Sequence, residues 1–148
     1  MIIQATTFDA DILTNIALLS KGYWGYTKNQ LQSWKEDLTV SSKMIDELIV
    51  FKFVIEDTIV GFYILNQPKN NRITLEFLFI HPNFIGQKIG SKLLNHAIKI
   101  ARNLNVTSIN LLADPNAVPF YKNHGVINIG KKESSIPNRY LPVLEKTI

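Results

Sequence analysis

The sequence predicts a single-domain α/β fold in which a mixed, mostly antiparallel central sheet is flanked by helices, in the order β-α-α-β-β-β-α-β-α-β-β. Three observations lead to this class. Seven runs of β-branched, aromatic and other apolar residues have the length of strands, and three of them follow one another directly. Amphipathic helical patterns separate the other runs. Because 46% of the 148 residues are apolar, the chain can bury one core, and we expect one domain over residues 1–148.

The first third of the chain is predicted to be mainly helical. The expected elements are an opening strand over residues 2–6, an amphipathic helix over 9–22, a second helix through Trp34 and a helical turn over 42–47. The clearest local signal is the pair Thr27 and Gln30, which has the spacing of a capping box at the start of the second helix.

The rest of the chain is predicted to alternate strands with helices. Three strands over residues 48–56, 58–65 and 72–80 are expected to form an antiparallel meander, because only short polar breaks separate them. The longest helical pattern follows over residues 86–104. A short strand over 108–113, a short helix over 117–123 ended by Gly125, and closing strands within 126–132 and 139–146 complete the prediction.

Composition excludes several classes of function. The chain has no cysteine, which removes disulfides, cysteine nucleophiles and thiolate metal sites. The net charge of +4 is dispersed, so a nucleic-acid partner is not favoured. We find neither a secretory signal nor an apolar run of membrane-spanning length, and expect a cytoplasmic protein without a membrane partner. The spacing of His81, His96 and His124 predicts no metal site.

The connection between the strand over 72–80 and the long helix is a candidate anion site. Its glycines precede a helix N-terminus, where unpaired backbone amides and the helix dipole favour a phosphate. The letters from Gly86 to Lys92 read GQKIGSK, which matches neither the P-loop pattern nor the dinucleotide fingerprint GxGxxG. The phosphate ligand is therefore expected to be of another kind.

Two segments resemble the GNAT superfamily of N-acetyltransferases. LEFLFIHPNFIGQKIGSKLL is similar to the family's fourth strand and diphosphate loop, in which Gln or Arg is followed three residues later by Gly and, two residues after that Gly, by Gly or Ala. Gly90 matches the last small residue, whereas Ile85 stands at the Gln or Arg position and Lys88 at the middle glycine.

The second segment, ADPNAVPFYKNHGV, is similar to the family's pattern of Asn, Ala, an aromatic pair, Gly and Phe. The residues in register are Asn116, Phe120, Tyr121 and Gly125, with Pro119 at the Ala position and Val126 at the Phe position. Together with the order of elements, the resemblance covers nearly the whole chain.

The resemblance implies that acetyl-CoA binds where strands four and five separate, and that its acetyl group is transferred directly to a primary amine of a small molecule or peptide. The pantetheine arm is expected along Leu78, Phe79 and Ile80. The remaining cofactor-binding residues implied by the family are Ile85, Gly86, Gln87, Lys88, Gly90, Ser91, Asn116 and Tyr121. No metal is expected, and a homodimer is possible because dimers are common in such families.

Two residues are catalytic candidates. Glu76 is the lone carboxylate in the strand TLEFLFI, where a charge is costly unless it faces water or a cleft; it is the candidate base, and an outward-facing residue is the alternative. The resemblance makes Tyr121 the acid that protonates the departing thiolate, with an ordinary half-buried aromatic as the alternative. For Asn116, an N-cap explains the residue equally well.

The acceptor is expected to lie near Tyr23, Trp24, Tyr26 and Glu76, because the first two helices shape the acceptor pocket in the family. Core packing of these aromatic residues and Trp34 is the equal alternative. Arg139 and Tyr140 precede the last strand, where surface roles are favoured. Two other functions stay open: a GNAT-like module that binds CoA without turnover, suggested by Ile85 and Lys88, and a basic nucleic-acid binder.

Overall fold

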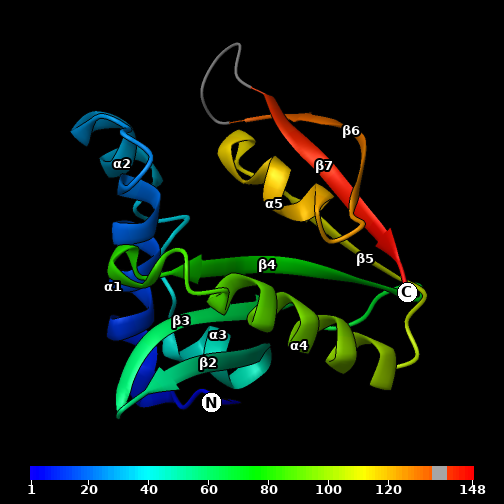
Figure 1. Cartoon of the computed structure of the whole chain (residues 1–148), viewed down its shortest axis with the longest axis horizontal. Helices are drawn as coiled ribbons and strands as arrows, with labels where there is room; N and C mark the ends of the chain where they lie inside the picture. Colours follow the sequence, from blue (N-terminus) through cyan, green and yellow to red (C-terminus); the bar gives the residue numbers. More distant parts are fainter. Residues whose placement is uncertain (135–139) are drawn as a thin grey trace.

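The computed structural model describes residues 1–134 and 140–148 and contains one seven-stranded sheet with helices on both faces (Figure 1). The strands are β1 Ile2–Gln4, β2 Ile49–Ile55, β3 Thr58–Leu65, β4 Arg72–Ile80, β5 Ser108–Leu112, β6 Ile127–Glu133 and β7 Tyr140–Thr147. The α-helices are α1 Ala10–Gly22, α2 Lys28–Trp34, α3 Ser42–Glu47, α4 Ile89–Asn103 and α5 Val118–Lys122. Short 3-10 turns lie at Thr7–Asp9, Pro82–Phe84 and Pro115–Ala117.

The spatial order of the strands is β1-β2-β3-β4-β5-β7-β6. Every neighbouring pair is antiparallel except β4 and β5, which are parallel. The predicted mixed sheet and the predicted β2–β3–β4 meander are therefore confirmed. The capping box also forms, because Thr27 Oγ1 accepts from the amide of Gln30 and Gln30 Oε1 accepts from the amide of Thr27.

Two hydrophobic cores lie on opposite faces of the sheet. One packs α1, α2 and α3 against the strands and includes Leu13, Trp34 and Phe77. The other packs α4 and α5 against the opposite face and includes Leu75, Leu93 and Tyr121. Because side chains of a strand alternate between faces, β3 serves both cores in turn.

An irregularity in β4 changes this alternation. Leu65 pairs with Leu75 and the preceding Ile64 pairs with Phe77, so Glu76 is an extra residue without a partner in β3. Such a bulge re-aims the side chain that it carries. Leu75 belongs to the core that α4 and α5 cover, whereas Phe77, on the other side of Glu76, belongs to the core that α1, α2 and α3 cover.

Some predicted boundaries and roles differ from the structure. The long helix begins at Ile89 and not at Gly86, because Lys88 is its N-cap residue in the left-handed conformation (φ 63°). Asp114, not Asn116, caps the turn after β5, since its carboxylate accepts from the amide of Asn116.

His96 of α4 is half-buried, and its Nδ1 lies 2.7 Å from the hydroxyl of Tyr63. Arg139 and the start of the predicted closing strand at 139 lie outside the described residues. Within the described part of the chain, no helix combines the length and apolarity that crossing a bilayer requires.

Candidate active site

The parallel strands β4 and β5 stay together for only three residues each. Arg72–Thr74 pairs with Ser108–Asn110, and at the last pair Thr74 Oγ1 donates to Asn110 Oδ1 over 2.9 Å. Beyond this point β4 remains paired with β3 on its other side, and β5 with β7. Figure 1 shows the two strands diverging from this end of the sheet. A cleft of about 480 Å³ opens between them.

The walls of the cleft are mainly apolar, and polar groups lie at its two ends. Its middle is lined by Leu75, Leu78 and Ile80 of β4 and by Leu111 and Leu112 of β5. Because β4 has no β5 partner after Thr74, backbone groups of its last residues face the cleft without a strand on that side. An extended chain with apolar surface and a few amide groups suits such a wall.

One end of the cleft is the loop before α4, which we call the anion end and define as residues 85–91. Gly86 has φ 90° and Lys88 has φ 63°, so two left-handed residues turn the backbone immediately before the helix. Ile89, Gly90 and Ser91 form the first turn of α4, whose amides have no partner within the helix. These groups and the helix dipole together suit a phosphate.

Gly90 has a second reason to be small. A Cβ at this position lies 3.3 Å from Cε1 of Phe120, so a larger residue requires the ring of Phe120, which lines the cleft, to shift by a few tenths of an ångström. The close approach of α4 to α5 therefore depends on Gly90. By contrast, a Cβ at Gly86 meets no described atom within 4 Å, and its positive φ is what favours glycine there.

Glu76 lines the cleft because it is the bulged residue of β4. Its side chain is exposed, and its Oε1 accepts a hydrogen bond of 3.2 Å from Nδ2 of Asn66. A carboxylate that keeps free lone pairs in a cleft can accept a proton.

Tyr121 lines the opposite wall from α5, and its side chain is 6% exposed. Burial raises the pKa of the Tyr121 hydroxyl well above its usual range, because the phenolate loses its hydration. The hydroxyl is therefore neutral at pH 7, and it can donate a proton to an acceptor in the cleft.

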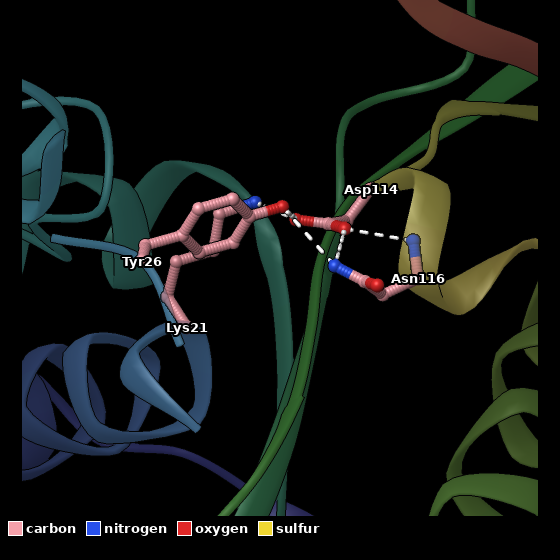
Figure 2. Close-up of polar contacts among 4 residues, drawn as sticks. All are labelled: Lys21, Tyr26, Asp114 and Asn116. Carbon is pink, nitrogen blue, oxygen red and sulfur yellow. Dashed lines mark hydrogen bonds and ion pairs between the residues drawn. The ribbon is translucent and has the colours of Figure 1, made fainter. Parts of the chain in front are cut away.

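The other end of the cleft holds a polar cluster that we call the strap: Lys21, Tyr26, Asp114 and Asn116 (Figure 2). Lys21 of α1 forms an ion pair with Asp114, which follows β5. The hydroxyl of Tyr26 donates to the same carboxylate over 2.8 Å, and Nδ2 of Asn116 donates to the Tyr26 oxygen over 3.2 Å. The strap thus joins the helices of one sheet face to the β5 side of the cleft.

Aromatic rings complete the surroundings of Lys21. Its Nζ lies 5.4 Å from the ring centre of Tyr26 and 5.0 Å from that of Trp34. Burial alone raises the pKa of Asp114, but the hydrogen bonds from Lys21, the Asn116 amide and Tyr26 outweigh it and lower the pKa. Asp114 is consequently a carboxylate at neutral pH.

The structure brings most of the predicted site residues to this one cleft. Those that line it are Trp24, Glu76, Leu78, Phe79, Ile80, Ile85, Gly86, Lys88, Gly90, Ser91, Asn116 and Tyr121. Gln87 and Tyr23 are not lining residues, and Tyr23 is 53% exposed beside Trp24. Tyr26 contributes its hydroxyl to the strap, and Trp34 is core.

The sequence predictions missed Lys21 and Asp114, which also line the cleft. No local pattern connects Lys21 with a residue 93 positions away. The only signal for Asp114 is the Asp-Pro-Asn sequence, which is typical of a capped turn. Among the described residues, no group of three or more His, Asp or Glu side chains is arranged to hold a metal ion.

The fold of this chain matches those of solved N-acetyltransferases. A GCN5-related N-acetyltransferase from Rhodopseudomonas palustris has a TM-score of 0.85 at 19% identity, covering 100% of this chain and 95% of that one. The PaiA N-acetyltransferase from Thermoplasma acidophilum, in complex with coenzyme A, has a TM-score of 0.76 at 22% identity, covering 100% and 98%. At these identities the likeness establishes the fold.

The chain belongs to the acetyltransferase (GNAT) family, whose family model matches residues 16–126. Its curated relatives include the uncharacterized N-acetyltransferase ycf52 of the algae Pyropia yezoensis and Gracilaria tenuistipitata, 30% and 27% identical over 103 residues, or 70% of this chain. The matched region spans only 58% and 56% of those two proteins.

Proposed function

We propose that this protein is an N-acetyltransferase that moves an acetyl group from acetyl-CoA directly to a primary amine. The observation that carries the proposal is the shared cleft: the anion end, Glu76 and Tyr121 all line it. Family membership supports the same class of reaction. We further propose that one domain over residues 1–148 carries the activity in the cytoplasm.

The cleft fits the three chemical parts of acetyl-CoA. The amides and left-handed turns of residues 85–91 suit the diphosphate, and Lys88 adds a positive charge. The free edge of β4 at Leu78, Phe79 and Ile80 suits the amide-bearing pantetheine arm. Phe120, which packs closely against Gly90, lines the cleft between the sites proposed for the diphosphate and for the pantetheine arm.

When bound, acetyl-CoA supplies an acetyl group activated as a thioester. Glu76 accepts the proton of the attacking ammonium, directly or through a water, because only the neutral amine has a free lone pair. Tyr121 donates its hydroxyl proton to the departing sulfur, and its neutral state at pH 7 supports this role. The ammonium loses two protons when it becomes an amide and the sulfur gains one, so each turnover releases one proton to solvent and returns Glu76 and Tyr121 to their starting states.

The acceptor is proposed to approach along Trp24, which follows α1, is 46% exposed and lines the cleft with Ser20 of that helix. Solved proteins of similar fold include a ribosomal-protein-S18-alanine N-acetyltransferase from Escherichia coli and an aminoglycoside 6′-N-acetyltransferase. Those acceptors differ in size but share a primary amine, which is the class that we propose here.

Two measurements test the proposal. Saturating acetyl-CoA is expected to raise the melting temperature, because a ligand at 100 times its Kd stabilises the folded state by about 2.7 kcal/mol. Release of free CoA thiol with a panel of amines then identifies the acceptor. Binding without thiol release from any amine would favour a CoA-binding module without turnover, and no binding by calorimetry would reject the cosubstrate.

A further inference from the structure

A hydrogen-bonded pair connects the anion end to α5. Ser91 belongs to the first turn of α4 and lines the cleft. Its Oγ lies 3.0 Å from Nε2 of His124, the second residue after α5. The other ring nitrogen, Nδ1, lies 2.8 Å from the carbonyl oxygen of Phe120. The imidazole of His124 is therefore held at both nitrogens, directly behind a hydroxyl of the cleft.

The chemistry of these partners determines where each proton lies. A carbonyl oxygen only accepts, so Nδ1 of His124 must carry a proton. In the neutral imidazole Nε2 is then an acceptor, and Ser91 must donate its only hydroxyl proton to it. In the imidazolium Nε2 is a donor, so Ser91 accepts from His124 and its own proton is free to point elsewhere.

This difference matters for an anion at residues 85–91. A phosphate oxygen has lone pairs and needs donors around it. With neutral His124, Ser91 presents a lone pair to the cleft; with protonated His124, Ser91 can present its O–H. The imidazolium also adds one positive charge behind the hydroxyl.

We propose that His124 is a positioning residue that controls the Ser91 hydroxyl and thereby couples diphosphate binding to the uptake of one proton. The proposal rests on the proposed binding of acetyl-CoA in the cleft. Linkage requires that binding be tighter at low pH and that the bound diphosphate favour protonated His124.

Among the described residues, the elements next to His124 carry several lysines. Lys146 of β7 donates from Nζ to the carbonyl oxygen of His124 over 3.0 Å. On the α4 side, Lys88 lines the cleft and Lys92 lies over the ring of Phe53. Lys122 is on α5 and exposed.

The test is calorimetric binding of 3′-dephospho-CoA between pH 5.5 and 8.0. This probe keeps the diphosphate but lacks the 3′-phosphate, whose own titration near pH 6 obscures the result with CoA. For the wild-type protein we expect about tenfold tighter binding at pH 5.5, equivalent to about 1.4 kcal/mol. The apparent enthalpy in two buffers of different ionisation enthalpy is expected to report net proton uptake.

Variants separate His124 from other titrating groups. His124→Phe keeps a ring against Phe120 and leaves the Ser91 proton free at every pH, so its affinity is expected to be independent of pH. Ser91→Ala is expected to bind weakly throughout and to keep only the smaller pH dependence that comes from the charge of His124. His96→Phe is the matched control, because His96 bonds to Tyr63 outside the cleft, and the wild-type pH dependence is expected to remain.

Wild-type binding that is equally tight at all pH values, without proton uptake, overturns the proposal. So does a pH dependence that both Ser91→Ala and His124→Phe retain. Circular dichroism at each pH establishes that the variants are folded, and the wild-type measurements stand without them. Failure of the probe and of CoA to bind at any pH overturns the cosubstrate assignment itself, and this inference with it.

Discussion

The two ends of the cleft are built from residues at very different separations in the chain. The anion end is one loop and one helical turn, residues 85–91, and its shape follows from local backbone angles at Gly86 and Lys88. The strap joins pairs that are 88 to 93 positions apart, from α1 and Tyr26 on one side to Asp114 and Asn116 on the other. One end forms with its own helix, whereas the other forms only when the whole sheet has folded.

This difference predicts different energetics. A local turn is formed at small cost in chain entropy, and changes in it are expected to alter ligand affinity more than stability. The strap contains a nearly buried ion pair, in which the side chains of Lys21 and Asp114 are 15% and 12% exposed. Removing one partner of such a pair leaves a charge without compensation, which destabilises the folded state.

The largest effect is expected at neither end but between them, at Tyr121. Tyr121→Phe keeps the buried ring and removes the proton donor, so the turnover rate is expected to fall about 10²–10⁴-fold if protonation of the thiolate limits the rate. The affinity for CoA, measured by calorimetry, is expected to stay within about twofold of the wild type. Unchanged turnover in the Phe variant would remove Tyr121 from the mechanism.

Asp114→Ala tests the strap. It leaves Lys21 buried without its carboxylate, and we expect the free energy of unfolding in urea at pH 7 to fall by about 3 kcal/mol. The matched control is Asp9→Ala, because Asp9 forms an ion pair of 2.7 Å with Lys52 and is buried to a similar degree. Both variants should lose similar stability, but only Asp114→Ala should also weaken CoA binding. An equal loss of CoA affinity in the two variants would show that the strap makes no specific contribution to CoA binding.

The same variant has a pH signature. The folded-state pKa of Asp114 is lowered, so the stabilisation by its charge is present above the unfolded-state pKa near 3.8 and is lost as the pH falls through the folded-state pKa. The acid-unfolding transition of Asp114→Ala should therefore lack this contribution. The difference in stability from the wild type should shrink below about pH 4.

Glu76→Gln tests the proposed base. The amide cannot accept a proton, so the rate should fall most at low pH, where the amine is mainly protonated, with about a tenfold or greater loss. The loss should be smaller at high pH, where the acceptor is already neutral. Initial rates of thiol release across pH 6–9 make this comparison. A loss of equal size at every pH would assign Glu76 to binding or packing.

The smallest effect is expected for the charge of Lys88. Lys88→Ala keeps a Cβ on the left-handed backbone and should weaken acetyl-CoA binding about two- to fivefold at low salt, and less at high salt, because exposed charge pairs are weak and screened. Lys88→Gly removes the same charge but suits the φ of 63° better. Restored affinity in the Gly variant alone would show that backbone strain, and not charge, matters at this position.

The sequence predicts most of what is local in this molecule. Alternating and helical patterns place all seven strands and the main helices, and the glycines before α4 point to the anion end. The left-handed Lys88 was not predicted, because a lysine carries no signal for that conformation. The Lys21–Asp114 pair could not be predicted either, since neither residue has a neighbour that indicates its partner. The bulge at Glu76 depends on the register with β3 and is equally invisible in one strand.

The bulge in β4 leaves Glu76, the proposed base, outside both hydrophobic cores. If Glu76 is skipped, Leu75, Phe77, Leu78 and Phe79 alternate regularly between the two cores, as a strand without any insertion does. The carboxylate is thus carried by a residue of β4 that neither core uses. A single-codon deletion could erase the proposed chemistry and leave both hydrophobic faces in phase, and a single-codon insertion could restore it. An active and an inactive form of this strand would therefore differ by a single codon.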